Sequence, residues 1–213
     1  MSTKKRVLEN SFLYTFSSII MRATSFLLLP LYTNFLTPEE YGIVNLIDTF
    51  LEMSILIVSF SLSSGIIRFY VDLKENREEL RRYIGTVINF ITISSIFFSL
   101  IGLIFNQTLA NIFFDNISFY PYIFIALITI TFLTLHKVHG DIMQAKQQGR
   151  KLTIVNLIVF FNLIIMNIFF IIILNLGAVG MLLAQMFVYI GYLFYMIYDL
   201  KKNRLYICVF DTK

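Results

Sequence analysis

Long runs of apolar residues, broken by short polar and charged segments, dominate the pattern of the chain. A hydrocarbon core of about 30 Å requires about 20 apolar helical residues, and six runs reach that length. The last four runs contain no charged side chain, the first contains Arg22, and the second contains Asp48 and Glu52. The pattern therefore predicts an all-α integral membrane protein with six transmembrane helices, over residues 12–35, 42–67, 83–105, 117–135, 152–176 and 177–198.

The connection between the first two runs contains a helix-start signal. Thr37 is followed by Pro38 and, three residues after Thr37, by Glu40. A threonine cap, a proline at the first helical position and a glutamate three residues after the cap form a capping box with the favoured first residue. We therefore expect the second helix to begin near Pro38 and to pack antiparallel to the first after a short turn.

Composition supports a membrane protein and argues against other classes. Hydrophobic residues make up 58% of the chain and charged residues 14%, which leaves too little polar surface for a water-soluble domain. No phosphate-binding glycine loop, zinc-protease helix motif or nucleophile elbow is present, so we predict neither an enzyme nor a cofactor. His136 and His139 are spaced i, i+3, but we interpret them as neutral interfacial histidines and predict no metal site.

The placement of positive charge predicts orientation. The net charge of +4 could suggest nucleic acid, but its distribution favours membrane topology over a nucleic-acid partner. All but two of the 17 Lys and Arg residues fall in the N-terminal segment, the second and fourth connections and the C-terminal tail, which by the positive-inside rule face the cytoplasm. The exceptions are Arg22 and Arg68. We therefore predict a multi-pass protein of the bacterial cytoplasmic membrane with both termini cytoplasmic.

Charged residues inside the first two predicted helices mark a candidate pathway. A charge at the bilayer centre costs about 2.5–3.5 kcal/mol on insertion scales, so such groups usually face a partner or a hydrated cavity. Arg22 and Glu52 both lie near the membrane midplane, and Asn45, Asp48 and Glu52 share one helical face. Two interpretations remain open: a structural ion pair of Arg22 with Asp48 or Glu52, or a hydrated substrate or ion pathway.

Polar residues recur at helical spacing beside these charges, which supports the same inward-facing seam. In the first helix they are Ser11, Thr15, Ser18, Arg22 and Ser25, and in the fifth they are Asn156 and Asn167.

Four segments resemble the polysaccharide-exporting branch of the multidrug/oligosaccharidyl-lipid/polysaccharide exporter superfamily, and in particular its Wzx-type oligosaccharide flippases. These segments occur in the family order and cover nearly the whole chain. They are LLLPLYTNFLTPEEYGIVNL (27–46), GIIRFYVD (65–72), DIMQAKQQGRKLTIVNLI (141–158) and LGAVGMLLAQ (176–185).

The resemblance implies a multidrug-efflux (MATE-like) fold that moves a polyprenyl-diphosphate-linked oligosaccharide between leaflets by alternating access. It implies that Arg22 contacts the diphosphate or an anionic sugar, and that Asp48 and Glu52 serve ion coupling or sugar binding. It also assigns a patch to the inner gate, made of Gly65, Arg68, Phe69 and Tyr70.

Members of this family have about twelve to fourteen helices in two lobes, and this chain has six. The resemblance therefore implies the N-terminal lobe, with a second lobe or another copy of the chain as partner besides membrane lipid and the lipid-linked substrate. The alternatives are a lobe of a MATE-like drug or cation exporter and an inactive truncated membrane remnant.

Overall fold

A computed structural model describes residues 3–60, 62–114 and 117–205, apart from the side chains of residues 3–7, 22, 24, 25, 63 and 64. Every regular element in these ranges is helical, which confirms the predicted fold class. Two elements, η1 and η2, are short, wide helical turns that adjoin longer helices. In chain order the elements are α1 (Thr3–Phe35), α2 (Pro38–Ser59), α3 (Leu62–Leu73), α4 (Arg77–Ile104), α5 (Asn106–Phe113), η1 (Phe119–Ile123), α6 (Phe124–Ala145), α7 (Gly149–Asn167), η2 (Ile168–Ile173) and α8 (Gly177–Lys202).

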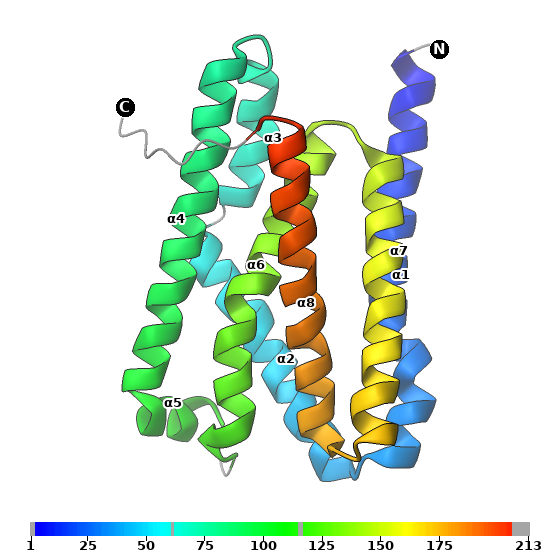
Figure 1. Ribbon diagram of the computed structural model, residues 1–213, viewed down its shortest axis with the longest axis vertical. Coiled ribbons are helices and arrows are strands. Elements are labelled where there is room, and N and C mark those ends of the chain that lie inside the picture. The colour runs from blue at the N-terminus through cyan, green and yellow to red at the C-terminus, as the bar shows by residue number, and fades with distance from the viewer. Residues whose placement is uncertain (1–2, 61, 115–116, 206–213) are drawn as a thin grey trace.

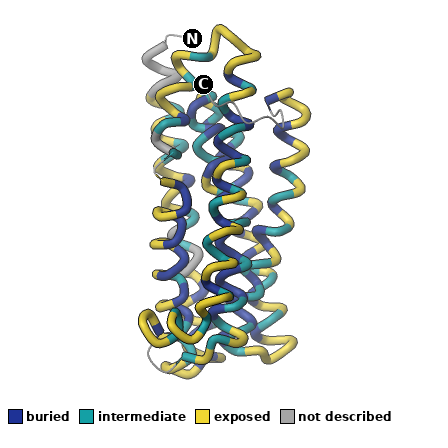
Figure 2. The backbone as a smooth tube through the Cα atoms, turned by 90° about the vertical axis from the view of Figure 1, so that its left-hand side faces the viewer, coloured by how far each residue is buried: buried dark blue, intermediate teal, exposed yellow. Residues whose placement is uncertain are grey.

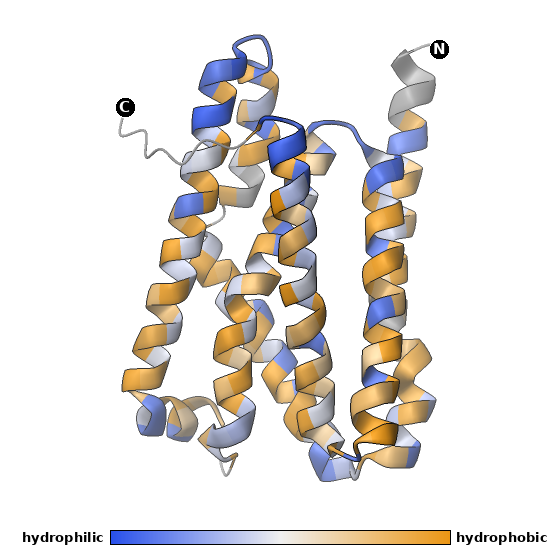
Figure 3. Cartoon of the chain, viewed as in Figure 1, coloured by the Kyte–Doolittle hydropathy of each residue, from blue (hydrophilic) through white to orange (hydrophobic). Residues whose placement is uncertain are grey.

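Six helical segments within the described ranges are long and apolar enough to cross a membrane, and they run roughly along the long axis of the bundle (Figure 1). Hydrophilic residues gather at the end that holds the α3–α4 turn, the α6–α7 connection and the end of α8 (Figure 3). We call this the basic end. The six segments are Leu8–Phe35, Pro38–Ser59, Arg77–Ile104, Phe119–Ala145, Gly149–Ile173 and Gly177–Lys202.

The outer faces of these helices are apolar and open to the surroundings. Phe97 on α4 is 62% exposed, Ile158 on α7 is 56% exposed, and Phe194 on α8 is 69% exposed. Buried residues lie along the inward helix faces and exposed residues along the outward ones (Figure 2). So much exposed apolar surface is unfavourable in water, whereas lipid is its natural solvent.

The predicted start of the second helix is confirmed. The Glu40 amide donates to Thr37 Oγ1 at 3.2 Å, and the Thr37 amide donates to Glu40 Oε2 at 2.9 Å. Pro38 occupies the first helical position, where no intrahelical partner for an amide hydrogen is needed. This capping box sets both the start of α2 and the short turn that joins it to α1.

The range 42–67 does not form the single helix that the apolar run predicts. The helix is interrupted at Phe60, whose backbone adopts a left-handed conformation (φ 44°), and α3 begins at Leu62. The sequence around the break is rich in serine, and serine hydroxyls compete with the helical backbone for hydrogen bonds. Without a proline or glycine at the break, the apolar pattern gave no sign of it.

Two further helices extend past their apolar runs at the basic end. The third span begins at Arg77 instead of residue 83, and the fourth ends at Ala145 instead of residue 135. Helical hydrogen bonding continues past the apolar run because charged side chains at a membrane surface do not interrupt a helix. As a result, Lys137 lies within α6 and not in a connection.

Helix α6 occupies the centre of the bundle and contacts α2, α3, α4, α7 and α8, while α1 packs along α7. Buried apolar residues form two clusters, one toward each end. Ile130 and Ile142 of α6, which lie more than three helical turns apart, belong to the opposite-end and basic-end clusters respectively. The region between the two clusters holds the polar residues described next.

Candidate functional site

A cavity of about 530 Å³ lies between α1, α2, α6, α7 and α8. Apolar side chains such as Leu51 and Met181 form part of its wall. The remaining wall is polar or charged, which is unusual for the interior of a membrane-spanning bundle. The polar and charged lining residues are Tyr32, Asp48, Glu52, Lys137, Asn167, Gln185 and Tyr189.

Asp48 and Glu52 lie in the wall that α2 contributes. They are one turn apart, so their side chains project from the same helix face, as the spacing predicts. Asp48 is half-buried and accepts a hydrogen bond from the side-chain amide of Gln185 on α8, at 2.9 Å. Glu52 is exposed and lines the more open part of the cavity.

Lys137 brings a positive charge to the same cavity from α6. The sequence placed this lysine in a cytoplasmic connection, because the apolar run ends at residue 135. Continuation of α6 moves it onto the cavity wall instead, where it is exposed. The cavity thus combines two carboxylates and one ammonium group from two neighbouring helices, with an amide between α2 and α8.

Polar residues of α7 join that helix to α1. The Tyr32 hydroxyl donates to Asn167 Oδ1 at 3.3 Å, and the Asn167 amide donates to the Leu163 carbonyl at 2.8 Å. The side-chain amide of Asn156 donates to Ser17 Oγ at 2.7 Å. Asn167 therefore lines the cavity, whereas Asn156 serves the α1–α7 contact.

The other predicted pathway residues have different positions. Asn45 is exposed on α2, one turn before Asp48, and is not among the residues lining the cavity. Arg22 lies in α1, but the structure does not describe its side chain. The preceding residue, Met21, lines the cavity. The prediction that Arg22 faces the pathway therefore remains a prediction.

The predicted inner-gate patch lies on α3, apart from the cavity. The ring centroids of Phe69 and Tyr83 on α4 are 5.4 Å apart, and a Cβ atom at Gly65 would lie 3.2 Å from the Tyr83 hydroxyl oxygen. Arg68 is exposed, and Tyr70 faces the basic end. Gly65 thus permits close approach of α3 and α4, which fits a packing role; the gate function stays a prediction.

A buried polar cluster near the basic end was not predicted. His139 is fully buried; its Nδ1 is 2.7 Å from the Tyr192 hydroxyl and its Nε2 is 3.2 Å from Asp199 Oδ2. The ammonium group of Lys151 donates to Asp199 Oδ1. The cluster ties α6, α7 and α8 together. The sequence shows His139, and it shows Asp199 just beyond an apolar run. Nothing in the local pattern indicates that their side chains are in contact.

Six apolar spans, five of which line a partly charged cavity, define a multi-pass membrane protein. A family model described as "Polysaccharide biosynthesis protein" matches residues 7–209, and the chain belongs to this family. Membership indicates a membrane transport role in polysaccharide synthesis. No curated protein and no solved structure matches the chain.

Proposed function

We propose that the chain forms one lobe of a flippase that moves a polyprenyl-diphosphate-linked oligosaccharide across the bacterial cytoplasmic membrane. The observation that carries the proposal is the cavity lined by Asp48, Glu52 and Lys137, in a chain that belongs to a family of polysaccharide biosynthesis proteins. Charged groups in a membrane interior are costly and are mostly retained for substrates or ions. The chain acts as a transporter and carries out no covalent chemistry.

The lining groups match the chemistry of such a substrate. Asp48, Glu52 and Gln185 offer hydrogen-bond acceptors and donors to sugar hydroxyls, while Lys137 offers a positive charge to a phosphate. Arg22 adds a second cation in this proposal. Asp48 or Glu52 takes part in ion coupling.

A second lobe, or another copy of the chain, completes the cavity in this proposal. Glu52 and Lys137 line the cavity and are nevertheless exposed at the surface of the described chain. A cavity with charged groups left open on one side cannot keep a substrate away from lipid. In this proposal the chain is the N-terminal half of a two-lobe transporter, with both termini in the cytoplasm.

Complementation tests this proposal. The chain is expressed in a bacterial strain that lacks its oligosaccharide flippase, alone and together with a second-lobe chain, and surface polysaccharide is measured. We expect export in at least one arm, and loss of export in Asp48→Asn and Lys137→Gln at unchanged membrane levels. Arg82→Gln is the matched control, because Arg82 is exposed and pairs with Glu78 away from the cavity. No polysaccharide in either arm, or export insensitive to both cavity variants, would overturn the proposal.

A drug or cation exporter is the second candidate, and the excess of carboxylates in the cavity favours it. Asp48 and Glu52 outnumber Lys137 among the described charged residues of the wall. Efflux of a cationic dye from the same strain distinguishes the two functions. Dye efflux without polysaccharide export would favour the exporter, and absence of both activities would indicate an inactive remnant.

A further inference from the structure

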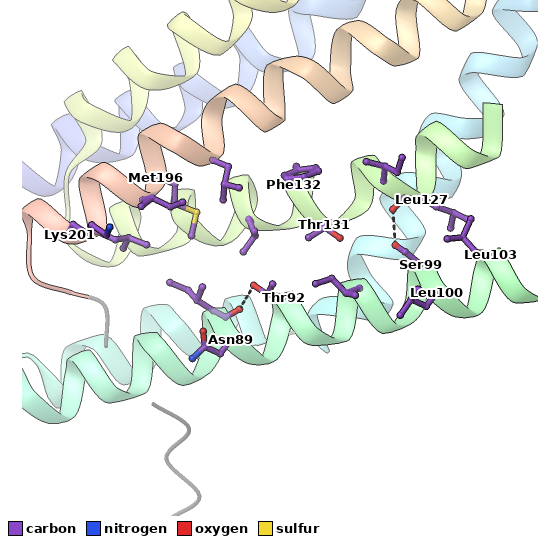
Figure 4. A pocket seen from close by; sticks show the side chains of 17 residues that line it. Asn89, Thr92, Ser99, Leu100, Leu103, Leu127, Thr131, Phe132, Met196 and Lys201 are labelled. Carbon is purple, nitrogen blue, oxygen red and sulfur yellow. Dashed lines mark hydrogen bonds between the residues drawn. The ribbon is translucent and has the colours of Figure 1, made fainter. Parts of the chain in front are cut away.

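A second cavity, a groove of about 610 Å³, lies between α4, α6 and α8 and shares no lining residue with the polar cavity (Figure 4). Its wall is almost entirely apolar. The Thr92 hydroxyl donates to the Ile88 carbonyl and the Ser99 hydroxyl donates to the Leu127 carbonyl, both at 2.7 Å. Since these hydroxyls are satisfied within the protein, they require no polar ligand.

The length and lining of the groove fit a hydrocarbon chain. Along α4 its lining runs from Ile88 to Leu103, which is about 23 Å at the rise of an α-helix. A long apolar groove with a volume of about 610 Å³ accommodates one flexible acyl chain along its length. We therefore take a lipid chain as its occupant.

One end of the groove is positively charged. Among the described residues that line it, Lys201 alone carries a formal charge, and it lies at the basic end. The next residue, Lys202, lines a hollow of about 840 Å³ that is formed by the ends of α3, α4, α6 and α8. Six cations line this hollow: Lys74, Arg77, Arg81, Lys146, Lys202 and Arg204.

These cations have little compensation within the described chain. Glu78 also lines the hollow, but its carboxylate pairs with Arg82 at 2.8 Å. The Nε atom of Arg81 is buried and has no hydrogen-bond partner among the described residues. Burial, and then the charge of Lys151, lower the pKa of Lys146 below its ordinary value, and the carboxylate of Asp199 offsets only part of this effect. An anion in this hollow would supply both the missing charge and an acceptor for Arg81.

We propose that the groove and the hollow together bind one anionic membrane phospholipid, with an acyl chain between α4, α6 and α8 and its phosphate among the cations around Arg81. The occupant is a bilayer lipid and not the transported substrate, because α6 and α8 separate the groove from the polar cavity. The lipid chain fills the space between α4, α6 and α8 and so supports the position of α4. This site is independent of the proposed flippase activity.

Thermal unfolding of the purified full chain in uncharged detergent tests the site with three probes: phosphatidylglycerol, phosphatidylcholine and inorganic phosphate. We expect saturable stabilisation by phosphatidylglycerol at about tenfold lower concentration than by phosphatidylcholine, because the cations of the hollow repel the choline ammonium group of phosphatidylcholine, which phosphatidylglycerol lacks. Equal effects of the two lipids would overturn the proposal. Full stabilisation by inorganic phosphate would reduce the site to an anion site without a lipid chain.

Two variants, each with a matched control, locate the binding. Arg81→Gln should weaken phosphatidylglycerol binding about tenfold, whereas Arg150→Gln, which is on α7, outside the hollow and paired with Glu9, should leave it unchanged. Thr131→Phe fills the groove and should abolish the preference for lipid over free phosphate, whereas Ile93→Phe, on the lipid-exposed face of α4, should not. Equal losses within either pair would overturn the site.

Two measurements keep the test independent of variant folding and of transport. Mass spectrometry of the wild-type chain, extracted gently from membranes, should find co-purified phosphatidylglycerol enriched over its share of the membrane. A polyprenyl phosphate that displaces phosphatidylglycerol at lower concentration would assign the groove to the substrate and overturn the phospholipid proposal. Because neither measurement needs transport activity, their failure is distinguishable from failure of complementation.

Discussion

The side-chain amide of Gln185 on α8 donates a hydrogen bond to the Asp48 carboxylate on α2, with 2.9 Å between Nε2 and Oδ1. These residues are separated by most of the chain, and their contact lies on the wall of the polar cavity. The hydrogen bond fixes the orientation of the Asp48 carboxylate. Without it, this half-buried carboxylate would lose the Gln185 donor. The position of Asp48 in the cavity thus depends on how two distant helices pack.

Gln185→Leu should lower both stability and transport. The substitution keeps the size of the side chain but removes the donor to Asp48, and a buried acceptor left without its partner costs about 1–3 kcal/mol. The thermal midpoint in detergent and polysaccharide export measure the two effects. Gln107→Leu is the control, because Gln107 is exposed on α5. Equal midpoints for the two variants would contradict the structural role of the Gln185 amide.

Arg22→Ala should abolish transport, and a double variant distinguishes the two interpretations of its charge. If Arg22 contacts substrate, Arg22→Ala combined with Glu52→Ala should restore nothing, because the substrate's binding partner is still missing. If Arg22 only neutralises Glu52, removal of both charges relieves the cost of a single unpaired ion and export should recover. Export normalised to membrane protein level is the measurement, and recovery in the double variant would sink the substrate-contact role.

Asp199→Ala should destabilise the chain far more than Glu9→Ala. Asp199 is 6% exposed and holds both the partly buried Lys151 and the fully buried His139, so its loss breaks a largely buried network and costs more than the loss of an exposed ion pair. Glu9 pairs with Arg150, whose side chain is 79% exposed, and such pairs contribute at most about 1 kcal/mol. Thermal unfolding of the two variants in the same detergent measures the difference. Similar shifts would show that the cluster around Asp199 is not a structural tie.

Thr37→Ala should lower stability by about 1 kcal/mol, the usual value of a helix N-cap. The substitution removes the acceptor for the Glu40 amide and leaves one amide at the start of α2 without a partner. Thr49→Ala is the matched control, because the Thr49 hydroxyl only donates to the Asn45 carbonyl of its own helix. A midpoint for Thr37→Ala that equals that of Thr49→Ala would contradict the capping role.

The sequence alone determined that the protein lies in a lipid bilayer, how many spans it has and where α2 starts. These features follow from local patterns: an apolar run long enough for a bilayer records its environment directly, and the capping box of Thr37 and Glu40 needs only neighbouring residues. Local spacing also predicted that Asp48 and Glu52 share one helix face, because residues four apart in a helix lie on the same side.

Tertiary structure decided which polar residues meet. Lys137 reaches the cavity because α6 continues past its apolar run, and Gln185 meets Asp48 because α8 packs beside α2. The cluster of His139, Lys151 and Asp199 likewise joins three helices. The helix break at Phe60 could not be predicted, because no proline or glycine lies at that position. Contacts between helices depend on packing over the whole bundle, and a local hydrophobic pattern does not contain that information. The sequence therefore predicted a membrane transporter but not which residues line its cavity.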